Sequence, residues 1–269
     1  YHVSTLAQKQ TAAGAVLELR ETTDRVELAT PTQKVVAEKG ANGYILGVQV
    51  KVREEWKPFF DSGRPLVSGT SFDLHPASCK VEENTEDRKT LVFSGQHQNP
   101  EYPWEIRVEA SSGAPWIKFT IVCHLSIPLM LQGLEPVVAL WSRRPGVAVQ
   151  SDQGPDSIYR SAGIPHGFGF PAAHFWDDGV EAFVFFDMTP MTWMSQQGVW
   201  RFHDVRIQTR SDGEHTGLGM HLKKLSGKTI SAGDMVIPFY LCVQARPEKP
   251  TKLQALATMI ETFAPLHPA

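Results

Sequence analysis

Apolar and polar residues alternate along much of the first half of the chain, in short runs separated by turn-forming residues. In the stretch YILGVQVKV, which ends at Val52, apolar side chains occupy every second position. A period of two is typical of β-strands, whose successive side chains point to opposite faces. Polar clusters such as Glu83–Arg88, between Ser78–Glu82 and Lys89–Ser94, indicate hairpins. The pattern therefore predicts antiparallel β-structure.

The same rhythm returns in the second half of the chain. Ala172–Trp176 and Val180–Met188 flank Asp177-Asp178-Gly179, and Asp-Gly between apolar runs is a strong hairpin signal. The chain holds roughly fourteen strand-like runs, without a repeat that would indicate propeller blades. We expect residues 1–250 to form one large β domain.

The last residues follow a helical pattern instead. Thr251 and Gln254 fit a capping box. Five apolar residues then share one face at helical spacing: Leu253, Leu256, Ala257, Ile260 and Phe263. Residues 251–269 are therefore predicted to form a short C-terminal helix. Its apolar stripe must dock on the sandwich or lead into a helical domain outside this sequence.

Two long stretches interrupt the strand pattern. Glu54–Ser71 and Arg143–Pro171 are rich in proline, glycine and polar residues. We interpret both as irregular loops, and loops of this length are uncommon in compact domains unless they are functional or cover something.

Charge and composition narrow the function classes. The chain has 26 basic and 29 acidic residues, a formal net charge of −3, and the two signs are interleaved. Such a surface does not favour a nucleic-acid partner. No apolar run approaches the roughly 18–20 residues of a membrane-spanning helix, so a membrane partner is not expected either.

The three cysteines do not indicate a disulfide framework. Cys123 and Cys242 lie in apolar strand-like runs, and we interpret them as buried free thiols, with one possible disulfide bridge left open. The sequence begins at Tyr1 and is interpreted as an excerpt or a processed form, so its compartment is left unassigned.

Most catalytic signatures are missing from the sequence. It contains no G-x-S-x-G, H-E-x-x-H, H-x-H or C-x-x-C pattern, so neither a metal nor another cofactor is expected. Gly167-Phe-Gly169 imitates a dinucleotide-binding loop. However, Pro171 and the strand that follows exclude the helix N-terminus that such a loop requires.

Four residues are the best candidates for saccharide contacts. Arg160 and His166 belong to the long second loop, where no strand explains His166. Trp193 lies in a proline-containing connection, and Trp200 lies on an alternating strand. Indole rings can stack on a pyranose while sugar hydroxyls reach nearby polar groups.

A histidine and two carboxylates offer a different chemistry. His174 sits in mid-strand and is best interpreted as a hydrogen-bonded core histidine. Glu181 and Asp187 lie on a strand that is apolar on both faces, so each is either a strand-end or edge residue or points into a cleft. A histidine such as His166 or His174 with one of these carboxylates could act as acid and base.

The stretch VELATPTQKVVAEKGANGYILGVQV and the closing ISAGDMVIPFYLCV resemble the β-supersandwich, or galactose mutarotase-like, domains of carbohydrate-active enzymes. The resemblance covers most of the chain. It implies an all-β fold, a large antiparallel supersandwich with a short C-terminal helix. In several glycoside hydrolase and polysaccharide lyase families such a domain lies beside an (α/α) barrel.

This resemblance sets the functional expectations. True aldose epimerases of this fold use a histidine and a glutamate for proton transfer, and no local motif here assigns those roles. The leading hypothesis is therefore a structural or assisting β domain of a larger saccharide-processing enzyme, with a saccharide and an adjacent helical catalytic domain as partners. The alternatives are a stand-alone mutarotase-like epimerase or lyase, and a structural module without a sugar site.

Overall fold

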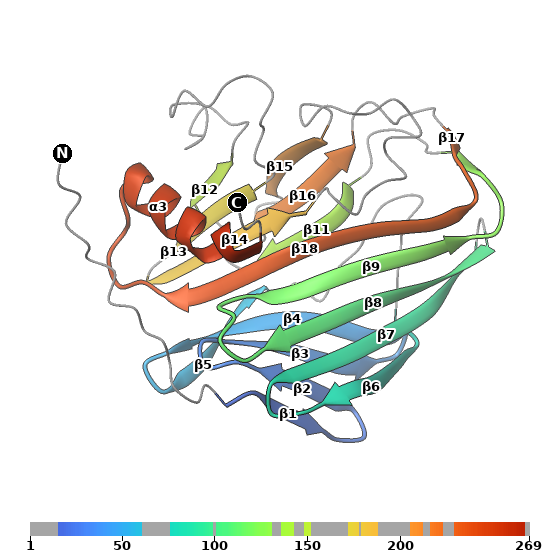
Figure 1. Cartoon of the computed structure of the whole chain (residues 1–269), viewed down its shortest axis with the longest axis horizontal. Helices are drawn as coiled ribbons and strands as arrows, with labels where there is room; N and C mark the ends of the chain where they lie inside the picture. Colours follow the sequence, from blue (N-terminus) through green and yellow to red (C-terminus); the bar gives the residue numbers. More distant parts are fainter. Residues whose placement is uncertain are drawn as a thin grey trace.

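The computed structural model describes residues 16–60, 76–98, 101–130, 136–142, 148–151, 172–177, 179–187, 205–211, 216–222 and 229–266. Within these ranges the chain forms antiparallel strands followed by one α-helix near its end (Figure 1). The prediction of an all-β antiparallel sandwich with a short C-terminal helix is confirmed.

The first large sheet is a five-stranded meander in which each strand pairs with the next along the chain. Its strands are β1 (Glu18–Glu21), β2 (Arg25–Ala29), β3 (Gln33–Gly40), β4 (Gly43–Val52) and β5 (Glu55–Phe60). Short turns connect these strands, so neighbours in sequence are also neighbours in space.

The second large sheet has eight strands in the order β12-β13-β14-β18-β9-β8-β7-β6. The last strand of the chain, β18, lies between β14 and β9 and so joins the two halves of this sheet. The strands are β6 (Ser78–Asn84), β7 (Arg88–Gln98), β8 (Glu101–Ser111), β9 (Ile117–Leu125), β12 (Ala148–Ser151), β13 (Ala172–Asp177), β14 (Val180–Phe186) and β18 (Gly233–Ala245).

Two smaller sheets complete the described strands. One pairs β10 (Leu129–Met130) with β17 (Thr229–Ile230). The other has the order β11-β16-β15, formed by β11 (Pro136–Ser142), β16 (Thr216–Leu222) and β15 (Val205–Ser211).

The main core lies between the two large sheets, which Figure 1 shows stacked on each other. It contains alternate residues of both, such as Leu28 and Val50 from the first sheet and Ile106 and Leu241 from the second. Alternation along each strand thus sends one set of side chains inward and leaves the other set on an outer face.

The C-terminal helix α3 (Lys252–Phe263) begins with the predicted capping box and continues into the short 3₁₀ helix η3 (Ala264–Leu266). Thr251 Oγ1 accepts from the Gln254 amide at 3.3 Å, and Gln254 Oε1 accepts from the Thr251 amide at 2.9 Å. Within the described ranges, neither helical segment has the length and apolar character needed to cross a bilayer.

The prediction of which helix face is buried is wrong in part. Ala255, Met259 and Phe263 pack against Phe185 and other residues on the outer face of the eight-stranded sheet. Three residues of the predicted stripe are exposed instead: Leu253, Ala257 and Ile260. A row spaced by four residues therefore contacts the sheet, although larger apolar side chains lie on the neighbouring face.

The structure also revises part of the two stretches interpreted as loops; residues 61–71, 143–147 and 152–171 of these stretches lie outside the described residues. Glu55–Phe60 of the first stretch forms β5, and Ala148–Ser151 of the second forms β12. The hairpin predicted around Gly179 is confirmed: β13 and β14 pair across it, and its φ of 86° is one that glycine adopts without steric cost. All three cysteines are free thiols.

Candidate functional site

The four predicted saccharide contacts lie outside the described residues. Arg160 and His166 fall in the range 152–171, and Trp193 and Trp200 fall in the range 188–204. Their roles therefore remain predictions. Two other groups of polar side chains can be built from the described strands.

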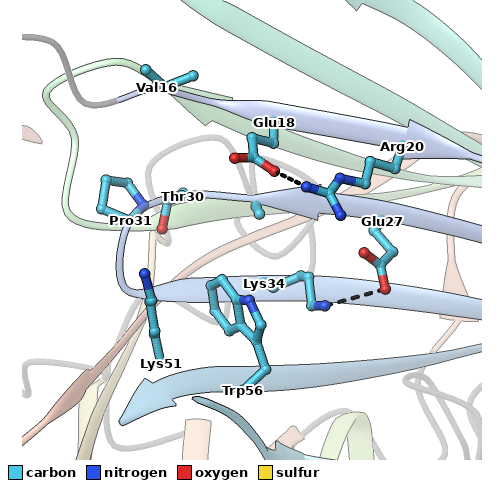
Figure 2. Close-up of a pocket in the computed structure, with 10 residues that line it drawn as sticks. Val16, Glu18, Arg20, Glu27, Thr30, Pro31, Lys34, Lys51 and Trp56 are labelled. Atoms are coloured by element: carbon cyan, nitrogen blue, oxygen red, sulfur yellow. Dashed lines mark hydrogen bonds and ion pairs between the residues drawn. The ribbon is translucent and has the colours of Figure 1, made fainter. Parts of the chain in front are cut away.

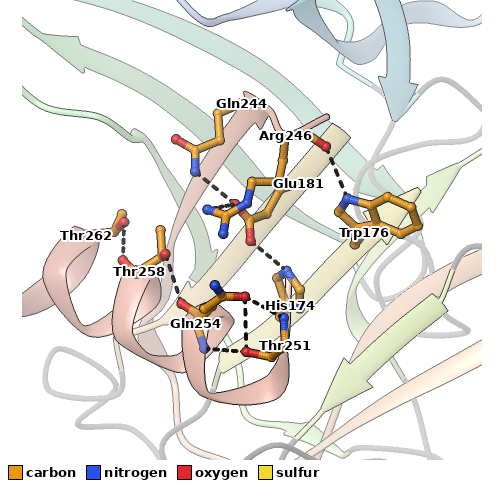
Figure 3. A network of polar contacts seen from close by, with 9 residues as sticks. All are labelled: His174, Trp176, Glu181, Gln244, Arg246, Thr251, Gln254, Thr258 and Thr262. Atoms are coloured by element: carbon orange, nitrogen blue, oxygen red, sulfur yellow. Dashed lines mark hydrogen bonds and ion pairs between the residues drawn. The ribbon is translucent and has the colours of Figure 1, made fainter. Parts of the chain in front are cut away.

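The first group forms where β13, β14 and β18 run side by side (Figure 3). His174 lies opposite Phe183, and Trp176 lies opposite Glu181, so the histidine and the glutamate share one face of the sheet. His174 Nε2 lies 3.1 Å from Glu181 Oε1. This pair brings together two of the residues considered for acid–base chemistry.

The carboxylate of Glu181 is fully engaged by protein groups. Gln244 Nε2 donates to Glu181 Oε2 at 3.0 Å, and the Arg246 guanidinium lies 3.7 Å from the same oxygen. The Trp176 indole N–H donates to the backbone carbonyl of Arg246 at 3.2 Å. These contacts satisfy a carboxylate that would otherwise be costly to bury.

The histidine and the glutamate of this group are buried. His174 is 2% exposed and Glu181 is 0% exposed, and the histidine ring stacks on Phe183 at 4.9 Å. Asp187, the other carboxylate considered, lies just beyond the opposite end of β14. The interpretation of His174 as a hydrogen-bonded core histidine is confirmed, and the cluster ties three strands together.

The second group lies on the outer face of the five-stranded sheet. Its residues follow from the strand register, which places Arg20 opposite Glu27 and Lys51 opposite Trp56. Lys34 lies between them on β3, paired with Ala29 on one side and Gln49 on the other. Each of the five strands therefore contributes to one surface.

These side chains line a hollow of about 230 Å³ on this face, and Figure 2 shows how they lie around it. Six of its residues carry charge or an indole ring: Glu18, Arg20, Glu27, Lys34, Lys51 and Trp56. The Lys34 ammonium lies 5.0 Å from the centre of the Trp56 ring, within the range of a cation–π contact. Trp56 is half-buried, so part of its ring remains accessible.

The charges in the hollow differ in how firmly they are paired. Glu27 is flanked by Lys34 at 3.2 Å and Arg25 at 2.6 Å. Partial burial acts to raise the pKa of Glu27, but hydrogen bonds from Arg25 and Lys34 outweigh it and hold that pKa below its usual value. Glu27 therefore stays ionised at neutral pH and fixes Lys34 beside the indole.

Lys51 is held less firmly. Its ammonium pairs at 3.1 Å with Glu54, whose side chain is 92% exposed, and such surface pairs contribute little free energy. Arg20 pairs with Glu18 at 2.8 Å, and both side chains are also largely exposed. The hollow thus combines a fixed lysine–indole pair with cations that can exchange partners.

This site was not predicted from the sequence, because Trp56 was expected to lie in a loop. The turn between β4 and β5 is formed by Arg53 and Glu54, with Arg53 at φ 58°. Non-glycine residues rarely adopt this conformation, so the sequence carried no usual turn signal. The available signal was the alternation of Glu55, Trp56, Lys57 and Pro58 beside the strand that ends at Val52.

Comparisons with known proteins bear on the fold. No family model matches the chain, and no curated protein matches its sequence. A TPR-domain containing protein from Parabacteroides distasonis ATCC 8503 is similar with a TM-score of 0.56 and 6% identity, over 85% of this chain and 48% of that one. A protein in glycosyl hydrolase family 38 from Enterococcus faecalis gives 0.50 and 10% identity, over 90% and 32%.

An α-mannosidase from Enterococcus faecalis V583 aligns with a TM-score of 0.49 and 8% identity, over 90% of this chain and 31% of that one. The chain thus spans about half of the Parabacteroides protein and about a third of the two Enterococcus proteins. At such low identity the similarity shows a shared fold alone. The chain therefore shares its fold with part of the Parabacteroides protein and with part of the family 38 protein.

Proposed function

We propose that this chain is a β-sandwich domain of a larger carbohydrate-processing enzyme, and that it assists the enzyme by binding saccharide. The observation that carries the proposal is the hollow on the five-stranded sheet, where an accessible indole is surrounded by charged hydrogen-bonding groups. An indole offers apolar area to the C–H face of a pyranose, while carboxylates and cations beside it bind the hydroxyls.

The size of the hollow fits this role. At about 230 Å³ it lies below the range of about 300–1,000 Å³ that is usual for drug-sized ligands. It is also open along an outer sheet face, formed by strands whose other side chains are anchored in the core. A rigid, shallow surface of this kind suits one sugar unit within an oligosaccharide, and that unit does not have to be the terminal one.

The fold supports placing the domain in a larger enzyme. A protein in glycosyl hydrolase family 38 contains this fold as 32% of its length. In our proposal the catalytic groups lie in another part of the parent protein, such as an adjacent helical domain. Arg160, His166, Trp193 and Trp200, which lie outside the described residues, would then be additional saccharide contacts.

The described residues do not favour the alternative of a stand-alone epimerase or lyase. His174 and Glu181 are within hydrogen-bonding distance, but the carboxylate oxygens of Glu181 already contact His174, Gln244 and Arg246. A general acid or base must reach the proton that it transfers, and this pair is buried.

Isothermal titration of the full chain against a panel of neutral and acidic oligosaccharides tests the proposal. We expect binding to at least one of them, and a loss of tenfold or more in affinity for Trp56→Ala, equivalent to about 1.4 kcal/mol. Trp56→Phe should retain part of the affinity, and Trp176→Phe serves as a tryptophan-removal control on the other sheet.

Two results would overturn the proposal. A folded wild-type chain that binds nothing in the panel would favour the purely structural module. Binding that is equally strong in Trp56→Ala would move the site away from the hollow, and the same panel applied to Trp193→Ala and Trp200→Ala would then test the two predicted tryptophans.

A further inference from the structure

We propose that the hollow selects sugars that carry a carboxylate, such as uronic or sialic acid units, with Lys51 as the residue that recognises the charge. The inference rests on the proposed saccharide binding and adds the chemical class of the sugar. Its basis is the charge arrangement around Trp56, where three cations and two carboxylates line the hollow and leave one positive charge in excess.

Lys34 does not supply the excess positive charge that a ligand could contact. Its side chain is only 10% exposed, its ammonium lies 3.2 Å from Glu27, and it lies against the Trp56 ring. Moving it to a ligand would leave the Glu27 carboxylate, itself 16% exposed, with one cation fewer. Lys34 and Glu27 therefore form the fixed floor of the hollow, and they orient the indole.

Lys51 is placed to receive an anion. It lies directly opposite Trp56 across β4 and β5, so both side chains rise from the same face, as Figure 2 shows. Its partner Glu54 sits in the β4–β5 turn and is 92% exposed, so solvent weakens the pair. A carboxylate bound over the indole would lie within reach of this ammonium and outside the fixed pair.

The cost of removing water from the Lys51 ammonium favours an acidic sugar over a neutral one. A neutral sugar resting on Trp56 would remove water from the half-buried Lys51 ammonium without giving it a charged partner. A carboxylate replaces that water with a charge-assisted hydrogen bond, which is roughly twice as strong as a neutral one. The acidic residues Glu18 and Glu27 then accept hydrogen bonds from sugar hydroxyls elsewhere in the hollow.

The test compares probes that differ in charge but little in shape. Trigalacturonate, its fully methyl-esterified form and neutral galactotriose would be titrated into the full chain, with sialyllactose against lactose as a second pair. We expect the free acid to bind at least tenfold more tightly than its ester, with an advantage that shrinks as salt is raised. The two probe pairs show whether uronate or sialate is the preferred source of the carboxylate.

Matched variants test whether Lys51 causes the preference for the free acid. Lys51→Gln should lose about tenfold in affinity for the acidic probe while keeping its affinity for the ester, and Lys51→Arg should retain the preference. Lys57→Gln is the control, because Lys57 is exposed and, one residue from Trp56, points to the opposite side of β5. Thermal unfolding of each variant checks that the fold is kept.

The outcomes separate this inference from the proposed function. Equal affinity for acid and ester, or equal losses in Lys51→Gln and Lys57→Gln, would overturn the carboxylate selection while Trp56-dependent binding still stood. A chain that binds none of the probes and nothing in the wider panel would overturn both.

Discussion

The buried side-chain amide of Gln33 joins the two large sheets. Its Nε2 donates to the backbone carbonyl of Pro115 at 3.0 Å, and its Oε1 accepts from the backbone N–H of Val243 at 3.0 Å. Gln33 is 0% exposed. Because both partners lie in the second sheet or in the turn that precedes β9, one side chain satisfies backbone groups across the core.

Replacing Gln33 tests this bridge. Gln33→Ala leaves a buried carbonyl and a buried N–H without their partner, and each such group costs about 1–3 kcal/mol. We expect the free energy of unfolding, measured in urea, to fall by about 2–4 kcal/mol. The exposed Gln96→Ala should change it by less than about 0.5 kcal/mol. Equal changes in the two variants would show that the bridge has no special role.

At the same scale, the cysteines behaved as the sequence predicted. Cys123 and Cys242 are buried free thiols, and burial raises the pKa of each to about 12. The prediction succeeded because apolar residues on both sides of a cysteine within one strand are themselves evidence that the cysteine is buried. Nothing local distinguishes Gln33 from a surface glutamine, since its burial depends on Pro115 and Val243, which are distant in sequence.

Among the elements, helix α3 and the strands beneath it form a second apolar cluster outside the main core. Phe263 contacts Phe185 with ring centres 5.4 Å apart and Trp116 with ring centres 6.2 Å apart. The helix covers the outer face of β14 and β18, as Figure 1 shows. An isolated helix of this length is marginal in water, so this packing stabilises it.

Two alanine variants compare the buried and exposed faces of α3. Phe263→Ala removes a 1% exposed ring and should destabilise the chain by about 3–5 kcal/mol. Ile260→Ala, at a position that is 52% exposed, should cost less than about 1 kcal/mol. Urea unfolding provides the measurement. A larger loss for Ile260 than for Phe263 would mean that the face predicted from the sequence is the buried one after all.

Local sequence signals predicted the start of helix α3, but neither its buried face nor strand β5. The capping box located the start of α3, because capping is a local interaction between Thr251 and Gln254. The buried face was misjudged because the fit of Ala255 and Met259 to the sheet depends on tertiary packing. Likewise β5 was missed because Arg53 forms its turn without glycine or asparagine.

At the scale of the whole molecule, the described part of each large sheet includes a carboxylate that lies between two cations on the outer face. Glu27 lies between Arg25 and Lys34 on the first sheet, and Glu109 contacts Arg88 and Lys118 on the second. For Glu109, burial acts to raise its pKa, but the contacts with Arg88 and Lys118 outweigh it and lower that pKa below its usual value.

These lowered pKa values predict the direction of acid unfolding. A carboxylate with a lower pKa in the folded state contributes stability at pH values above its unfolded pKa and loses it as pH falls through the folded pKa. Urea unfolding should therefore show stability falling between roughly pH 5 and pH 2. Glu109→Gln should reduce the steepness of that fall. A variant with an unchanged pH dependence would contradict the assignment.

The candidate site depends on how several strands pair, which explains why it was not predicted from the sequence. Trp56, Lys51 and Lys34 come from three strands, and only the pairing register places them on one surface. Alternation predicted the strands and the sandwich, but it does not specify which strand pairs with which or which face points outward. The predicted contacts Arg160, His166, Trp193 and Trp200 remain to be tested beside it.

The central claim, that the hollow binds saccharide, is tested most directly by nuclear magnetic resonance of the indole N–H groups. The chain has seven tryptophans, and the Trp56 signal is assigned by its loss in Trp56→Phe. We expect this signal to shift in a saturable way as an oligosaccharide that binds in the titration panel is added, while that of the buried Trp104 stays in place. Saturable shifts at Trp193 or Trp200 with an unmoved Trp56 signal would contradict the account.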